Sequence, residues 1–203
     1  MLMNKVETFL VISPANRVFQ RCVEIPTLRR LGGRTQGARA LEIGCGSGYG
    51  TKLIIDQFGA ATVDAVDLDP AMVTRARRRL RRYSDQVRIV QGSADDLQAA
   101  LDAGDATYDA VFDFGIIHHV TNWRDAVAEA ARVLRPGGRL FFLEVTATAL
   151  ARPSYRRLLD HPTQDRFTAG QFLAALADHG LDPADNWRTY VCSDYLAGVA
   201  QKS

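Results

Sequence analysis

Compact apolar runs alternate with longer amphipathic segments through the middle of the chain. The apolar runs have the length of buried strands and cover residues 38–43, 62–66, 87–90, 108–114 and 139–145. The segments between them place apolar residues at helical spacing and cover residues 47–58, 70–83, 94–101 and 123–134. Strands that alternate with helices predict βαβ units with right-handed crossovers, and hence an α/β domain with a mostly parallel, doubly wound sheet.

Both ends of the chain depart from this alternation. Residues 1–34 predict two or three short helices, because Pro14 and Pro26 interrupt the pattern and a glycine pair follows it. Towards the other end, Thr168 is the expected N-cap of a further helix and Gly180 its terminator. Two closing runs lie close enough to pair as a hairpin, residues 186–192 and 195–201.

The overall composition excludes several classes of protein. The chain has 203 residues, 47% of them hydrophobic and 24% charged, as expected for one globular domain with its own core. The longest apolar run, residues 140–143, is far too short to span a bilayer, and residues 1–12 lack a small-residue cleavage site. We therefore expect no membrane association, no signal peptide and a cytoplasmic location. Because Cys22, Cys45 and Cys192 are widely spaced and form no C-x-x-C pair, neither a disulfide framework nor a metal site is expected.

The formal net charge of +2 gives no indication of a polyanionic partner. An arginine-rich run at residues 75–82 is the one local exception, and it could be a nucleic-acid patch. The alternative is the solvated face of an amphipathic helix, with Met72, Val73, Ala76 and Leu80 turned to the core. We favour the helix because no interleaved aromatic residues accompany the run, and no nucleic-acid partner is expected.

A glycine-rich segment, residues 41–50, follows the first predicted strand and opens the first long helix. A plain strand-to-helix turn needs one glycine or two, whereas this segment has four at alternate positions, Gly44, Gly46, Gly48 and Gly50. Glycines at the carboxyl end of a strand let the backbone approach a nucleotide-type ligand closely. The dinucleotide pattern G-x-G-x-x-G/A fails in all three registers, and no Lys-Ser/Thr pair completes a P-loop.

The pattern that remains, E-x-G-x-G-x-G from Glu42 to Gly48, resembles the class I S-adenosylmethionine-dependent methyltransferases. The resemblance extends over about residues 38–145 and includes the helix-turn-strand at residues 131–140, where Pro-Gly-Gly is expected to end a helix and reverse the chain. It implies a Rossmann-like, doubly wound, mostly parallel seven-stranded sheet with an antiparallel last strand, in a three-layer αβα arrangement. It also implies a single methyltransferase domain over residues 1–203, with residues 1–34 as a helical lid on a core of residues 35–203.

The resemblance also implies S-adenosyl-L-methionine as the cofactor and a set of residues that hold it. Glu42 would lie beneath the methionine moiety, and Asp67 would accept hydrogen bonds from both ribose hydroxyls, whereas Asp69 is better explained as a helix N-cap. At the adenine-binding turn the family commonly has an acid where this chain has Ser93, so either Ser93 or Asp95 could serve. The expected cofactor-binding residues are Glu42, Gly44, Cys45, Gly46, Gly48, Asp67, Leu68, Ser93, Ala94, Asp95 and Asp113.

Methyl transfer needs mainly alignment of the reactants, and a general base helps when the acceptor must lose a proton. His118 and His119 are candidates because they follow the fourth strand, although both could be structural. Asp113 is a third candidate, with capping of the loop amides as its alternative role. Cys45 is more consistent with a small loop residue than with a nucleophile, since no base is paired with it.

Residues 1–34 and 146–168 lie outside the shared motifs and are expected to determine the substrate, for which a small-molecule acceptor is the leading class. Oxygen, nitrogen and carbon acceptors all remain open. Arg17 and Arg21 lie one helical turn apart and could reach the cofactor carboxylate, or they could be ordinary surface arginines. Two other functions remain possible: an NAD-dependent oxidoreductase, which shares the fold and the ribose acid, and a non-catalytic S-adenosylmethionine-binding protein.

Overall fold

The computed structural model describes residues 4–153, 155 and 165–203 of the chain. In these residues one sheet has the strand order β3-β2-β1-β4-β5-β8-β6, with β7 also paired to β8. Strands β1 to β5 pair in parallel, and β8 pairs antiparallel to β5. The predicted mostly parallel sheet with an antiparallel last strand is therefore confirmed. The strands are β1 (Arg39–Ile43), β2 (Thr62–Asp67), β3 (Val87–Gln91), β4 (Tyr108–Phe114), β5 (Leu134–Val145), β6 (Leu181–Asp182), β7 (Trp187–Tyr190) and β8 (Tyr195–Lys202).

The described sheet has eight strands, one more than the seven expected. The difference arises at the edge beside β8, where one strand position is divided in two. β7 pairs with residues 195–198 of β8 and β6 with residues 201–202, so the two short strands lie one after the other along the same edge. The predicted closing hairpin corresponds to β7 and β8.

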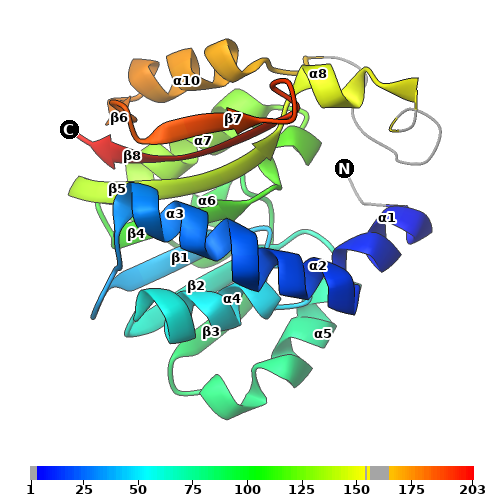
Figure 1. Cartoon of the computed structure of the whole chain (residues 1–203). Helices are drawn as coiled ribbons and strands as arrows, with labels where there is room; N and C mark the ends of the chain where they lie inside the picture. The colour runs from blue at the N-terminus through cyan, green and yellow to red at the C-terminus, as the bar shows by residue number, and fades with distance from the viewer. Residues whose placement is uncertain (1–3, 154, 156–164) are drawn as a thin grey trace.

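Helices cover both faces of this sheet, which gives the three layers expected (Figure 1). One face carries α3, α4 and α5, and the other carries α6, α7 and α10. The bounds are α1 (Lys5–Val11), α2 (Pro14–Phe19), the π-helical η1 (Gln20–Glu24), α3 (Ile25–Gly32), α4 (Tyr49–Leu53), the π-helical η2 (Ile54–Phe58), α5 (Pro70–Arg79), η3 (Arg81–Tyr83), α6 (Leu97–Leu101), η4 (Ile117–His119), α7 (Trp123–Val133), α8 (Ala147–Leu150) and α10 (Ala169–Asp178).

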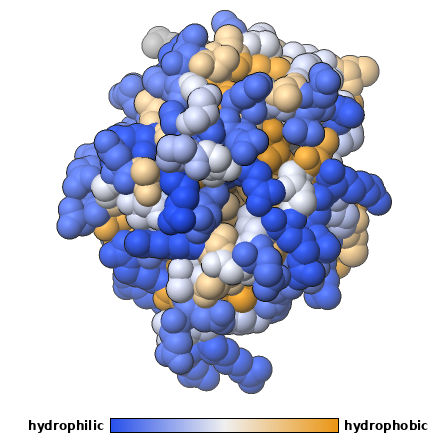
Figure 2. Space-filling view, turned by 90° about the vertical axis from the view of Figure 1, so that its left-hand side faces the viewer, coloured by the Kyte–Doolittle hydropathy of each residue, from blue (hydrophilic) through white to orange (hydrophobic). Residues whose placement is uncertain are grey.

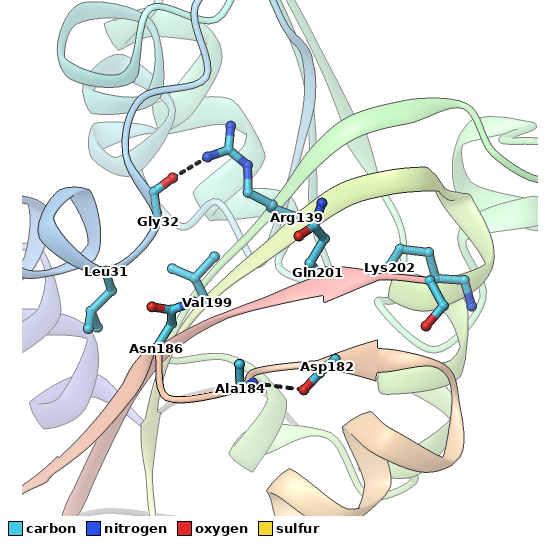
Figure 3. A pocket seen from close by; sticks show the side chains of 10 residues that line it. Leu31, Gly32, Arg139, Asp182, Ala184, Asn186, Val199, Gln201 and Lys202 are labelled. Carbon is cyan, nitrogen blue, oxygen red and sulfur yellow. Dashed lines mark hydrogen bonds between the residues drawn. The ribbon is translucent and has the colours of Figure 1, made fainter.

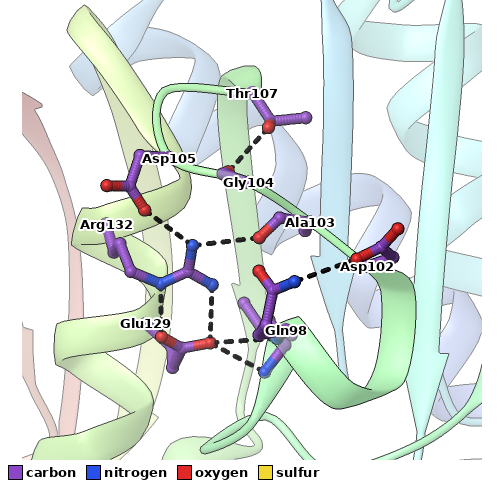
Figure 4. A network of polar contacts seen from close by, with 9 residues as sticks. Gln98, Asp102, Ala103, Gly104, Asp105, Thr107, Glu129 and Arg132 are labelled. Atoms are coloured by element: carbon purple, nitrogen blue, oxygen red, sulfur yellow. Dashed lines mark hydrogen bonds and ion pairs between the residues drawn. The ribbon is translucent and has the colours of Figure 1, made fainter.

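Each face of the sheet has its own hydrophobic core, because successive side chains of a strand point to opposite faces. Phe112 of β4 packs beneath α3 and η2, with ring centroids 4.8 Å from Phe58 and 4.7 Å from Phe141. Its neighbour Val111 points the other way, into the core shared with α6, α7 and α10. A polar network fixes α6 against α7 on that side: Glu129 accepts hydrogen bonds from the amide of Leu97 at 2.8 Å and from Arg132 at 2.6 Å (Figure 4).

The Pro-Gly-Gly segment does not have the role expected of it. α7 ends at Val133, and Leu134 is already paired with Tyr108 as the first residue of β5. The next pairing joins Ala110 to Arg139, so residues 135–138 form an irregularity inside the strand rather than a turn before it. The left-handed φ of +78° at Gly137 makes this path possible.

The N-terminal helices cross the carboxyl edge of the sheet, at the right of Figure 1, before α3 runs back over one face. α3 is anchored in the core by Ile25 and Leu28, which are 1% and 0% exposed. In contrast, most apolar side chains of α1, α2 and η1 are exposed. The exposed ones are Val6, Phe9, Leu10, Val11, Val18, Phe19 and Val23. Within the described residues, no helix is long and apolar enough to span a membrane.

The opposite edge of the sheet, where the parallel strands begin, is largely polar, with scattered apolar residues (Figure 2). A cleft of about 380 Å³ opens there between the end of α3 and the strands β5 to β8 (Figure 3). Its two cationic side chains are engaged by backbone carbonyls at the ends of helices. Arg139 donates to Gly32 and Arg34, and Lys202 donates to His179 at 2.7 Å. We therefore interpret these side chains as helix caps.

Candidate functional site

The glycine loop joins β1 to α4 at the carboxyl edge, and three of its glycines have positive φ: Gly44 at +67°, Gly46 at +52° and Gly48 at +78°. A Cβ on Gly44 would overlap Ile116, and one on Gly48 would lie 2.8 Å from Leu80. At Gly46 no atom of the described residues lies within 4 Å of the Cβ position. Packing inside the protein therefore explains two of these glycines, and Gly46 faces the open space in which a ligand would lie.

Asp67 ends β2 with its carboxylate against this loop. One oxygen accepts the amide of Gly46 at 2.7 Å, and the other accepts the amide of Asp69 at 2.9 Å. The residue is 8% exposed, and this burial raises its pKa. Asp69 caps α5 by accepting the amide of Ala71 at 2.7 Å, as expected. Leu68, between the two acids, is 46% exposed at the carboxyl edge.

Glu42 lies beneath the loop and is 2% exposed. It accepts a hydrogen bond from the hydroxyl of Thr51 in α4, which joins the strand to the helix across the glycines. A Cβ on Gly50 would overlap the Glu42 carboxylate, so that glycine makes room for the acid. Burial raises the pKa of Glu42 to about 8, so the protonated form predominates at neutral pH in the ligand-free protein.

Cys45 is 4% exposed, its amide donates to Val66 at 2.9 Å, and burial raises the pKa of its thiol. These features fit the loop residue that we expected. The turn after β3 adjoins Asp67, since the amide of Gly92 donates to the carbonyl of Asp67 at 3.0 Å. Within this turn the hydroxyl of Ser93 donates to Asp95, so the two adenine candidates form a single polar unit. Ala94 between them is 5% exposed.

The loop after β4 contains the candidate bases. Asp113 is fully buried and accepts the amides of Gly115 at 3.1 Å and Ile116 at 2.9 Å, which are the contacts of the capping alternative. His118 and His119 lie in η4, 9% and 4% exposed, with ring centroids 4.2 Å apart. Burial lowers the pKa of His118 to about 4, which keeps the imidazole neutral at pH 7.

Glu144 belongs to this loop's surroundings, although it was not identified from the sequence. It is 2% exposed on β5, and its Oε2 lies 2.6 Å from Nδ1 of His118. The available sequence indication was a single acid in the otherwise apolar run of residues 140–145. Like Asp67, Glu144 is an acid at the carboxyl end of a buried strand. Because the carboxyl ends of parallel strands meet at one edge of the sheet, this position could have identified it as a candidate site residue.

Two arginines flank the start of α4. Arg79 of α5, also missed in the sequence, donates to the carbonyl of Ser47 at 2.8 Å and to its hydroxyl at 2.6 Å. The guanidinium of Arg17, from α2, lies 6.0 Å from the ring centre of Tyr49, and that of Arg79 lies 5.9 Å from it. Nε of Arg17 is buried without an acceptor among the described residues. Arg21 is exposed on η1. Of the two arginines considered in the sequence, the structure places Arg17 beside the glycine loop.

All the predicted cofactor-binding residues thus lie at the carboxyl ends of β1 to β4 or in the loops that follow them (Figure 1). They come from positions up to 71 residues apart in the chain (Glu42 to Asp113) and meet because parallel neighbours end at the same edge. The arrangement offers an open glycine-lined surface, buried acids beneath it, and positive charge at one end. Such a site suits a ligand with a nucleoside and a zwitterionic end.

Comparisons with known proteins agree with this geometry. The family model described as "Methyltransferase domain" matches residues 41–142. A fatty-acid O-methyltransferase of Mycolicibacterium smegmatis is 34% identical over 135 residues, which are 64% of this chain and 45% of the relative. A ubiquinone biosynthesis O-methyltransferase of Xanthomonas oryzae pv. oryzae is 36% identical over 115 residues, 57% of this chain and 46% of the relative. The chain thus spans less than half the length of these two relatives.

Among solved structures, geranyl diphosphate methyltransferase in complex with S-adenosylmethionine superimposes with a TM-score of 0.73. The superposition covers 98% of this chain and 92% of that protein at 19% sequence identity, which is evidence for a shared fold.

Proposed function

The chain belongs to the S-adenosylmethionine-dependent methyltransferases, and on that premise we propose that it transfers a methyl group from S-adenosylmethionine to a small-molecule acceptor with an apolar part. The family match covers the glycine loop, the acid after β2 and the loop after β4. It favours a transferase over the NAD-dependent oxidoreductase that the fold alone would allow.

The observation that carries the proposal is the open space at Gly46 beside the Asp67 carboxylate. No described atom lies within 4 Å of the Cβ position of Gly46, whereas the Cβ positions of Gly44 and Gly48 are filled by the protein itself. The φ of +52° at Gly46 by itself favours glycine, and the open space beside it leaves room for a ligand to approach the backbone. The residues present therefore fit the cofactor.

Individual residues would hold different parts of S-adenosylmethionine. Asp67 would accept the ribose hydroxyls with the lone pairs that its two amide contacts leave available. Ser93 and Asp95 would bind the adenine amino group as one unit. Glu42 would lie beneath the positively charged methionine end, and Arg17 would pair with its carboxylate through the guanidinium whose Nε lacks an acceptor among the described residues.

When bound, the cofactor would supply a methyl group attached to a sulfonium sulfur. The lone pair of the acceptor would form the new bond to the methyl carbon, and the sulfur would keep the electron pair of the broken C–S bond. The protein's contribution is then to align the acceptor and to exclude water. An acceptor that carries a proton also needs a base, and His118, which is neutral at pH 7, or its neighbour His119 would take that proton. Asp113 is less suited to proton transfer, because loop amides already occupy one of its oxygens.

The apolar side chains exposed on the N-terminal helices support an acceptor with an apolar part. Phe9, Val18 and Phe19 are 70%, 62% and 51% exposed on helices that border the carboxyl edge. Isolated exposed apolar residues are ordinary, but a group of them beside a binding site is typical of a ligand-contacting surface. Two relatives are named for fatty-acid methylation and for ubiquinone biosynthesis, which is consistent with lipophilic acceptors. We propose that α1, α2 and η1 form the lid and that its apolar surface contacts the acceptor.

Titration calorimetry with S-adenosylmethionine, S-adenosylhomocysteine and NAD tests the cofactor assignment. Binding of the first two and not of NAD is expected, and no binding of either adenosyl compound at millimolar concentration would contradict it. Turnover against fatty acids, phenols, quinols and amines, with methyl transfer followed by mass spectrometry, then tests the acceptor. Cofactor binding without turnover on any of these compounds would favour the non-catalytic alternative.

A further inference from the structure

Glu144 forms the centre of a buried polar cluster at the carboxyl ends of β4 and β5. Its Oε1 accepts the amide of Ile117 at 2.7 Å, and its Oε2 lies 2.6 Å from Nδ1 of His118 and accepts the amide of Val145 at 3.2 Å. Both oxygens of one carboxyl are therefore engaged by donors from the loop and strand. These donors favour the carboxylate, which accepts at every one of these positions, and they oppose the burial that raises the pKa of Glu144 to about 7.

Asp113 completes the cluster from the adjacent strand. Its Oδ1 accepts the amides of Gly115 and Ile116, while its Oδ2 is buried with no donor among the described residues. Two carboxylates in one buried site repel each other, so the adjacent Glu144 favours the protonated form of Asp113. A proton on Oδ2 would also let that buried oxygen act as a donor. Burial and the neighbouring Glu144 charge raise the pKa of Asp113 well above its ordinary value, in agreement.

The state of Glu144 determines which nitrogen of His118 holds the ring proton. A carboxylate 2.6 Å from Nδ1 must receive a hydrogen bond from it, so Nδ1 carries the proton and Nε2 keeps the lone pair. An imidazole without such a partner is not confined to this tautomer. The contact with Ile117 immediately before His118 fixes the backbone of η4 at the same time. Glu144 thus controls both the position of the ring and the location of its basic nitrogen.

We infer that Glu144 is a positioning residue: its carboxylate holds His118 as the Nδ1–H tautomer and makes Nε2 the nitrogen that accepts a proton. The inference rests on the proposed function for its catalytic meaning, because only a proton-bearing methyl acceptor requires that nitrogen. The ring also faces His119, and Asp165 and Arg166 line the same crevice.

The tautomer can be measured directly in the full-length protein labelled with ¹⁵N-histidine. The chain has four histidines, and His118→Gln identifies the His118 signals in two-bond ¹H–¹⁵N spectra of the rings. At pH 7 the unsubstituted protein is expected to show protonated Nδ1 and unprotonated Nε2 at His118. The spectrum of the unsubstituted protein is decisive by itself: a proton on Nε2 instead would overturn the inference, whether or not any variant folds.

Variants then separate positioning from simple packing. Glu144→Gln retains a carbonyl acceptor and should keep the Nδ1–H tautomer, whereas Glu144→Leu removes the acceptor and should shift the ring towards Nε2–H. Glu129→Gln is the matched control, since Glu129 also accepts helix amides but lies in the separate Arg132 network (Figure 4), and it should leave the His118 signals unchanged. An unaltered tautomer in Glu144→Leu would contradict the inference.

Calorimetry with S-adenosylmethionine on the same samples distinguishes this inference from the proposed function. Glu144→Gln is expected to bind the cofactor as the unsubstituted protein does, because the cluster lies under η4 and not in the glycine loop. Absence of binding to the unsubstituted protein would refute the proposed function. Binding combined with an Nε2–H ring would refute the positioning role alone.

Discussion

Replacing Glu42 by glutamine should stabilise the ligand-free protein at alkaline pH. Glutamine has nearly the same size and keeps an acceptor for the Thr51 hydroxyl, but it cannot ionise. Burial raises the pKa of Glu42 to about 8 from its ordinary 4.5. Because the folded pKa is the higher one, the folded protein binds more protons than the unfolded chain across this window. The folding free energy that Glu42 contributes therefore becomes less favourable as the pH rises from about 5 to 8.

The magnitude follows from the pKa difference. At about 1.4 kcal/mol per pKa unit, the unsubstituted protein should lose roughly 3 kcal/mol of stability between pH 5 and pH 8 through this one group. For a domain of this size that loss corresponds to roughly 6–12 °C in Tm. Burial also raises the pKa values of Glu24 and Glu144 to about 7, but these groups titrate in both proteins. The difference between the unsubstituted protein and Glu42→Gln therefore isolates Glu42.

Urea unfolding followed by circular dichroism at pH 5, 6, 7 and 8 would measure this difference. The two stability curves should diverge as the pH rises, with Glu42→Gln the more stable protein at pH 8. Glu129→Gln is a control whose stability should change in the opposite direction. Arg132 lowers the pKa of Glu129, so the ionised form stabilises the fold and its removal should destabilise the protein. Parallel curves for the unsubstituted protein and Glu42→Gln would refute the reasoning.

The same substitution tests whether the cofactor lies above Glu42. A cationic methionine end over the loop would favour the Glu42 carboxylate, so binding at pH 7 should release protons. Calorimetry in phosphate and in Tris buffer should then give different binding enthalpies for the unsubstituted protein, with a smaller difference for Glu42→Gln. Equal proton release from the two proteins would show that Glu42 does not lie near the positive charge of the cofactor.

Three further predictions concern the cofactor and the lid. Asp67→Ala should weaken S-adenosylmethionine binding by about 2–3 kcal/mol in calorimetry, since hydrogen bonds to a charged acceptor are lost, and unchanged affinity would place the ribose elsewhere. Gly46→Val should keep a folded circular dichroism spectrum yet abolish binding, because its side chain enters the ligand space; retained binding would mean that the loop does not contact the ligand. Deleting residues 1–32 should unfold the protein, because Ile25 belongs to the core, whereas deleting residues 1–19 should leave it folded with weaker cofactor binding. Equal affinity after the shorter deletion would exclude a lid over the cofactor.

Much of the sheet was predictable because its indications are local. The five parallel strands lie where short apolar runs occur, and Asp69 and Thr168 cap their helices as expected from residue type alone. The glycine loop could also be predicted from the sequence, since four glycines at alternate positions after a buried strand are typical of few structures other than a ligand-binding loop. The prediction was wrong at Pro136, because pairing between Leu134 and Tyr108 extends β5 back to the end of α7. Pairing with a distant strand cannot be predicted from the secondary-structure propensities of the local residues.

The sequence by itself therefore determined the order of the elements, the glycine loop and the acids at the ends of β1, β2 and β4, all of which depend on neighbours along the chain. Only the tertiary structure decided what those residues touch. It showed that Gly44 and Gly48 make room for protein atoms while Gly46 faces open space. It also brought Glu144 to Nδ1 of His118 across 26 positions of sequence, and Asp113 to the same cluster. Adjacent parallel strands end side by side however long the connection between them is. The partner of a buried charged group is therefore determined by which strands are neighbours in the sheet and not by distance along the chain.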